Sequence, residues 1–65
     1  MNIDTRLSGD ELRLIRLAGR VTATSVARHW GVHRTRITNL EHEARPPRTA
    51  TARYLAALAA ALAER

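Results

Sequence analysis

The stretch Thr22–Glu41, TATSVARHWGVHRTRITNLE, predicts two short helices joined by a tight turn. Thr22 is a suitable cap for the first helix, and apolar residues then recur at three- and four-residue steps, at Ala23, Val26, Ala27 and Trp30. Gly31 ends this helix, because the left-handed conformation that follows many helices costs little only for a residue without a Cβ atom. We therefore expect the first helix over residues 23–30.

The second helix of this stretch begins at His33 or Thr35 and is expected over residues 34–42. Val32 fills the core between the two helices, while Ile37 and Leu40 face inward. The outward set is entirely polar and consists of Arg34, Thr35, Arg36, Thr38 and Asn39. Two helices at this spacing, the second with a polar face free of acids before Glu41, indicate DNA binding.

Residues 21–47, VTATSVARHWGVHRTRITNLEHEARPP, resemble the helix-turn-helix core of the phage Cro and CI repressor family. The resemblance runs through the pairs Val26-Ala27 and Gly31-Val32, the inward pair Ile37 and Leu40, and the acid Glu41. The chain departs from the family at Ala23, where glutamine is usual, and at Glu43, where glycine is common. The resemblance implies an all-α, four- to five-helix, lambda-repressor-like domain that acts as a small bacteriophage transcriptional repressor.

The resemblance also implies which residues meet DNA. Base edges in the major groove would be contacted by Arg34, Thr35, Arg36 and Asn39, and phosphates by Ala23, Thr24, Ser25, His33, Arg45 and Arg48. Arginine can read guanine and asparagine can read adenine, although one of the two arginines could equally hold a phosphate. The alternative is a helix face that is merely solvated.

A structural ion pair between Arg16 and Glu41 is a further implication of the resemblance, which sets an arginine of the N-terminal helix against the acid at the end of the second motif helix. Such a pair would brace the helix that enters the groove. In the alternative interpretation, Glu41 is a free surface acid.

The composition limits the chain to one small domain with a single modest core, since it has 65 residues and no cysteine. The net charge is +5, and all 11 basic residues are arginines, which favours a polyanionic partner. A GC-rich genome can equally explain the choice of arginine over lysine, but not its concentration around the motif helices. The N-terminal residues MNIDTRLSGDE contain no apolar run, so we expect neither a secretory signal nor a membrane anchor, and a location in the cytoplasm, which the phage resemblance implies is that of a bacterial host cell.

Two more helices are predicted on either side of the motif. The first is expected over residues 9–18, because Ser8–Glu11 has the pattern of a capping box and is flanked by Leu7 and Leu12. Gly19 ends this helix. After Pro46-Pro47, a last helix begins near Thr49 or Thr51 and is expected over residues 50–63. Its residues Tyr54, Leu58 and Leu62 are predicted to contribute to a homodimer contact; the alternative is that they pack only into the domain core.

Other chemistries find little support in the sequence. His29 and His33 are four residues apart, but Gly31 interrupts the helix between them, so we expect no metal site. No catalytic constellation, cofactor site or small-molecule ligand is predicted. The expected partner is a pseudo-palindromic double-stranded operator bound by a homodimer. The alternatives are an antitoxin of a toxin-antitoxin pair and a helical adaptor that binds an acidic protein.

Overall fold

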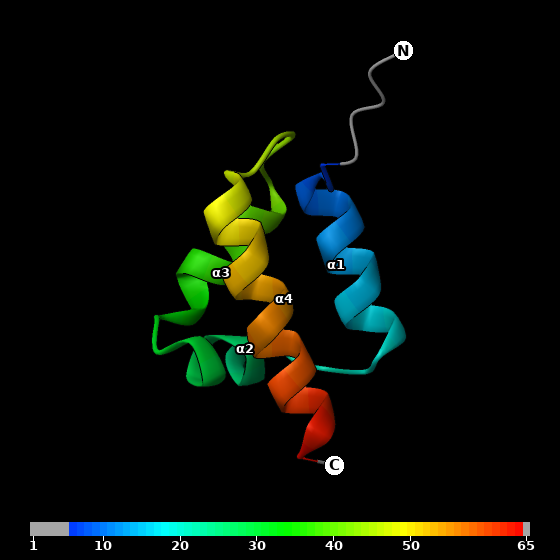
Figure 1. The fold of residues 1–65 in the computed structure, drawn as a ribbon, viewed down its shortest axis with the longest axis vertical. Coiled ribbons are helices and arrows are strands. Elements are labelled where there is room, and N and C mark those ends of the chain that lie inside the picture. Colours follow the sequence, from blue (N-terminus) through cyan, green and yellow to red (C-terminus); the bar gives the residue numbers. More distant parts are fainter. Residues whose placement is uncertain (1–5, 65) are drawn as a thin grey trace.

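The computed structural model describes residues 6–64, and this part of the chain is built from four α-helices without any strand (Figure 1). The helices are α1 (Gly9–Ala18), α2 (Ala23–Trp30), α3 (Arg34–Glu41) and α4 (Arg48–Ala63). The all-α prediction is confirmed over this range. Helix α3 ends one residue before the expected position, and α4 begins two residues before it. Residues 1–5 of the N-terminal segment discussed above lie outside the described range.

Side chains cap the first three helices. The capping box of α1 is present, because the Ser8 hydroxyl accepts from the Glu11 amide at 3.1 Å and the Glu11 carboxylate accepts from the Ser8 amide at 2.8 Å. Thr22 Oγ1 accepts from the third residue of α2, and His33 Nδ1 accepts from the second residue of α3. Helix α4 has no side-chain cap, and its N-cap residue is Pro47, with a φ of −56° and a ψ of 144°. The Thr51 amide donates to the Pro47 carbonyl at 2.9 Å, so the first helical turn already includes Arg48 and the helix begins before either threonine.

Helices α1 and α2 end in different ways. Gly31 follows α2 with a φ of 81°, as expected for a glycine in the left-handed region. Gly19 follows α1 in the ordinary right-handed region, and the left-handed residue is its neighbour Arg20, with a φ of 57°. The chain then turns back, so that the Val21 amide donates to the Arg16 carbonyl at 3.1 Å. The turn that leads into α2 is therefore made by an arginine.

Helix α4 crosses the molecule and packs against α2 and α1, while α3 packs against α2 and α1 (Figure 1). The buried face of α4 combines Tyr54 and Leu58 with small residues that allow close helix approach, namely Ala50, Ala57 and Ala61. Tyr54 is 0% exposed and Leu58 is 3% exposed. The predicted dimer contact through these two residues is therefore wrong, because both side chains are used in the domain's own core. Leu62 is 40% exposed and remains available.

Helix α1 makes a very close approach to the end of α3. A Cβ atom on Gly9 would lie 2.5 Å from the Leu40 carbonyl oxygen and 2.6 Å from the carbonyl carbon and oxygen of Glu41. The Gly9 amide also donates to the carbonyl of Glu43 at 2.8 Å. Only glycine lets the two backbones meet at this distance, so Gly9 sets the position of α3 relative to α1.

The outer side of α1 carries apolar residues that the domain does not cover. Leu12 is fully buried, whereas Leu14 is 63% and Leu17 is 45% exposed. The helix has more large apolar residues than a single buried stripe can hold. No helix within residues 6–64 combines the length and the apolar character that crossing a bilayer requires.

Candidate nucleic-acid interface

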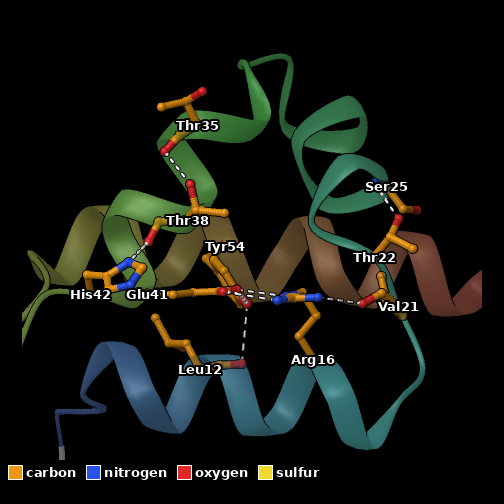
Figure 2. Close-up of polar contacts among 10 residues, drawn as sticks. All are labelled: Leu12, Arg16, Val21, Thr22, Ser25, Thr35, Thr38, Glu41, His42 and Tyr54. Atoms are coloured by element: carbon orange, nitrogen blue, oxygen red, sulfur yellow. Dashed lines mark hydrogen bonds and ion pairs between the residues drawn. The ribbon is translucent and has the colours of Figure 1, made fainter.

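The exposed surface of α3 is polar along its whole length. Ile37 and Leu40 are buried, and the residues that face solvent are Arg34, Thr35, Arg36, Thr38 and Asn39. All four residues predicted to contact bases are therefore brought together on one exposed helix. Figure 2 shows that Thr35 lies on the side of α3 that faces away from α1. The hydroxyl and amide groups of this surface can donate or accept hydrogen bonds with a partner, and its guanidinium groups can donate them.

Local hydrogen bonds order the first turns of α3. The Thr35 amide donates to His33 Nδ1 at 3.1 Å, and the Thr35 hydroxyl lies 2.8 Å from the same nitrogen. The Thr38 hydroxyl donates to the Thr35 carbonyl at 3.0 Å (Figure 2). Because Nδ1 of His33 is used by the cap, Nε2 is the ring nitrogen that is left for a partner. Thr35 therefore belongs both to the cap of α3 and to its exposed face.

A buried polar cluster holds α3 from behind. Arg16 of α1 donates from Nε to Glu41 Oε2 at 2.7 Å and from Nη2 to Oε1 at 3.0 Å, so the predicted ion pair is present and bidentate. Tyr54 of α4 adds a phenol that donates to Glu41 Oε2 at 2.5 Å, and Arg16 Nη1 donates to the Val21 carbonyl at 3.0 Å (Figure 2). Three helices thus meet at one carboxylate, and Arg16 also binds the α1–α2 turn.

The cluster is buried and its members shift one another's protonation. Burial alone raises the pKa of Glu41, but the hydrogen bonds from Arg16 and Tyr54, together with the charge of Arg16, bring this pKa below its ordinary value. The hydrogen bond to Glu41 raises the pKa of Arg16, although burial opposes it. Burial, and then the bond to Glu41, raise the pKa of the Tyr54 phenol. The folded state therefore favours a charged Arg16–Glu41 pair beside a neutral phenol.

Five of the six residues predicted to contact phosphates fall into two groups on either side of α3, and the sixth, His33, caps α3 itself. Ala23, Thr24 and Ser25 form the first turn of α2, where Thr24 is exposed and the Ser25 amide is already used by the cap. Arg45 lies in the α3–α4 connection and Arg48 begins α4, and both are exposed. Figure 1 shows that α2 and the α3–α4 connection lie at opposite ends of the domain. The two groups do not meet, but they flank α3.

The two histidines considered as a metal pair have separate surroundings. His29 Nδ1 lies 2.9 Å from the Ser25 carbonyl oxygen, and its Nε2 lies 2.6 Å from Glu64 at the end of α4. Arg28 also approaches Glu64, at 4.0 Å. His33 instead caps α3. The structure therefore assigns His29 to the α2–α4 contact and His33 to the helix start.

Two contacts were not anticipated from the sequence. The sequence leaves Tyr54 either in a dimer contact or in the apolar core, whereas its phenol completes the buried polar cluster around Glu41. The guanidinium carbon of Arg36 lies 5.6 Å from the ring centroid of Trp30, across the α2–α3 turn. The six-residue separation between these two positions matches no helical repeat, so periodicity does not reveal it.

Comparison with known proteins finds no matching protein family, no matching characterised protein and no matching solved structure.

Proposed function

We propose that this protein is a sequence-specific DNA-binding transcriptional repressor of the phage Cro type, in which α2 and α3 form a helix-turn-helix and α3 enters the major groove. The observation that carries the proposal is the surface of α3: a polar, acid-free exposed face on a helix that is clamped from behind by the Arg16–Glu41–Tyr54 cluster. A rigid helix with hydrogen-bonding groups on its outer side is suited to reading base edges.

The three-residue connection between α2 and α3 supports this assignment. Gly31 takes the left-handed conformation and His33 caps the next helix, so the two helices are joined by a tight turn. Thr35 and Asn39 lie at the centre of the exposed face, with Arg34 and Arg36 to its sides. In this proposal Asn39 and Arg34 supply bidentate base contacts, while α2 and residues near Arg45 bind the sugar–phosphate backbone.

Electrostatics supply the general affinity for DNA. The chain has a net charge of +5, and the acid at the end of α3, Glu41, is neutralised internally by Arg16. Each phosphate contact releases counterions, so binding should weaken steeply with salt. Repression would follow from occupying a promoter, because a bound protein excludes other proteins from the same duplex.

We further propose that a homodimer binds the operator, with two α3 helices reading half-sites about one helical turn apart. Of the residues assigned to this contact from the sequence, only Leu62 is still exposed. Sedimentation of the protein alone and on a full operator measures the stoichiometry directly. A single copy on the full operator would contradict the homodimer.

Selection of bound sites from random duplex DNA at a fixed salt concentration tests the proposal. We expect enrichment of an inverted repeat. Arg34→Ala should then cost about 1–3 kcal/mol on the selected site and relax preference at one base position. Arg13→Ala, which removes an exposed arginine from α1, is the matched control and should leave base preference unchanged. If no motif is enriched, α3 does not read sequence and the proposed function is wrong.

A second candidate is an antitoxin-type regulator, which would add a protein partner to the same DNA-binding face. The observation that favours it is the exposed apolar side of α1, with Leu14 and Leu17 uncovered. Co-expression with the product of any small gene adjacent to this one tests it. A stable complex that Leu14→Glu disrupts would support this candidate, and independent elution of the two proteins would exclude it.

A further inference from the structure

We infer that Trp30 holds Arg36 against one side of α3, so that Arg36 binds a backbone phosphate of DNA and does not read a base. This inference rests on the proposed function and assigns a specific task to one of the two arginines of α3. It also makes Trp30 a positioning residue, which acts on DNA only through Arg36.

The first observation is the contact itself. The guanidinium carbon of Arg36 lies 5.6 Å from the Trp30 ring centroid, within the range in which a cation is attracted to the face of an aromatic ring. Trp30 is the last residue of α2 and Arg36 is the third residue of α3, so the contact spans the turn between the helices. Indole is the best of the aromatic side chains for this interaction.

The ring is held in place independently of Arg36. Trp30 is partly buried and packs against the hydrophobic core. Its other surroundings belong to α2 and α4, where it lines a hollow together with His29, Arg53 and Ala57. Because the indole is anchored by the core and Arg36 is exposed, the ring positions the guanidinium and not the reverse.

Helix geometry places Arg36 at the side of the exposed face. Successive residues of an α-helix are rotated by about 100°. Arg36 directly precedes Ile37, which is fully buried, so it lies about a quarter turn away from the outward line of Thr35 and Asn39. The contact with Trp30 holds the side chain on this flank.

The dimensions of the major groove indicate which part of the DNA a side chain on this flank would contact. The groove is about 12 Å wide, and a helix with its side chains is about 10–12 Å across. A helix that enters the groove therefore fills it, with its outward line against the base edges and its flanks against the two sugar–phosphate walls. A side chain held on a flank, as Arg36 is by Trp30, meets a phosphate before it meets a base. Arg34, on the other side of the face, has no such aromatic contact among residues 6–64, so its side chain can turn toward the base edges.

The chemistry of the guanidinium suits this arrangement. A contact between the guanidinium and an aromatic ring does not use the N–H donors of the planar group, so they remain free to bond two phosphate oxygens. Holding the long side chain in one place in the free protein also reduces the freedom that it loses on binding. Lysine at this position would keep the charge but not the paired donors of the guanidinium.

The test measures affinity against salt on two duplexes, the selected operator and a scrambled sequence. Arg36→Ala should weaken binding to both duplexes by a similar factor, roughly tenfold, and reduce the slope of log K against log salt by about one. Trp30→Leu should act in the same direction, and the double variant should be no weaker than Arg36→Ala. Trp30→Phe keeps an aromatic face and should restore most of the binding.

Two controls accompany these variants. Arg13→Ala removes an equal charge from α1 and should not reproduce the change in slope. Thermal melting of each variant identifies a temperature at which all are folded, so that lost packing around Trp30 is not read as lost binding.

The outcomes separate this inference from the proposed function. If Arg36→Ala alters base preference on the operator and leaves the salt slope unchanged, Arg36 reads a base and the inference is overturned. If Trp30→Leu and Arg36→Ala are additive, Trp30 does not position Arg36. In both cases the wild-type protein still binds its operator and the proposed function stands, whereas a wild-type protein that binds neither duplex contradicts both.

Discussion

Arg20 carries a backbone conformation that glycine usually takes. Its φ of 57° follows Gly19, which is in the ordinary helical region. A side chain in the left-handed region brings Cβ close to the following carbonyl, which costs about 1–2 kcal/mol. The arrangement persists because the turn from α1 to α2 must bring Val21 into the core, where it is 6% exposed.

Replacing Arg20 by glycine and by alanine separates this backbone strain from the contacts of the arginine side chain. Both variants lose those contacts, but only glycine is relieved in the left-handed region. We expect Arg20→Gly to be more stable than Arg20→Ala by about 1 kcal/mol in the free energy of unfolding. Denaturant unfolding followed by circular dichroism measures the difference. Equal stabilities would show that the turn imposes no strain on Arg20.

At the scale of elements, α3 depends on its neighbours. It has 8 residues, and an isolated helix of fewer than about 12 residues is marginal in water. Its stability must come from the caps, from the packing of Ile37 and Leu40, and from the ion pair with α1. The helix proposed to read DNA is therefore positioned mainly through contacts that lie on its hidden side.

The approach of α1 to α3 gives a prediction with an internal control. Gly9→Ala places a Cβ against the backbone of Leu40 and Glu41, which cannot move without shifting α3, so the free energy of unfolding should fall by about 1–3 kcal/mol or more. Gly19→Ala is the same change at the other end of α1, where the nearest atom is Leu62 Cδ2 at 3.1 Å, in a side chain that can rotate.

Gly19 also has an ordinary helical φ of −82°, so alanine there should be within about 0.5 kcal/mol of the wild type. Thermal and denaturant unfolding of the two variants provide the comparison. A Gly9→Ala protein as stable as Gly19→Ala would mean that the close contact is not maintained in solution.

At the scale of the whole molecule, one buried carboxylate connects α1, α3 and α4. Removing a single partner of a buried ion pair leaves an uncompensated charge and typically costs about 3–5 kcal/mol. For a domain of 65 residues with one small core this is a large fraction of the total stability. The Arg16–Glu41–Tyr54 cluster therefore couples the stability of the whole domain to pH.

The direction in which stability changes with pH follows from the pKa shifts of Glu41 and Tyr54. The pKa of Glu41 is lowered on folding, so its contribution is present above the ordinary value of 4.5 and is lost as the pH falls through the folded value. The pKa of Tyr54 is raised, so its contribution is present below about 10 and is lost as the pH rises further. We expect the melting temperature to fall at both extremes.

Tyr54→Phe tests this assignment while leaving the ion pair intact. The variant lacks a hydrogen bond that lowers the pKa of Glu41, so its acid loss of stability should begin at higher pH. The loss of stability at alkaline pH that is due to ionisation of Tyr54 should disappear. Melting temperatures measured across the pH range compare the two proteins, and unchanged acid profiles would show that Tyr54 does not stabilise the Glu41 carboxylate.

Local signals in the sequence determined the helices of this protein. The capping box at Ser8, the cap at Thr22 and the left-handed Gly31 each depend on residues a few positions apart, so they could be predicted without knowing the fold. The polar face of α3 was predicted for the same reason, because helical periodicity alone separates it from Ile37. The ion pair of Arg16 with Glu41 came from the family resemblance, and the structure contains it.

Tertiary packing decided which face of each helix is buried and which neighbour covers it. Tyr54 and Leu58 form part of an apolar helix that could face either the core or a partner, and only the path of α4 across the domain buries both of them. The contact of Gly9 with α3 and the contact of Trp30 with Arg36 also depend on the angles at which helices meet. Periodicity reports which residues share a face of a helix, but the neighbour that covers this face is chosen by the packing of the whole chain.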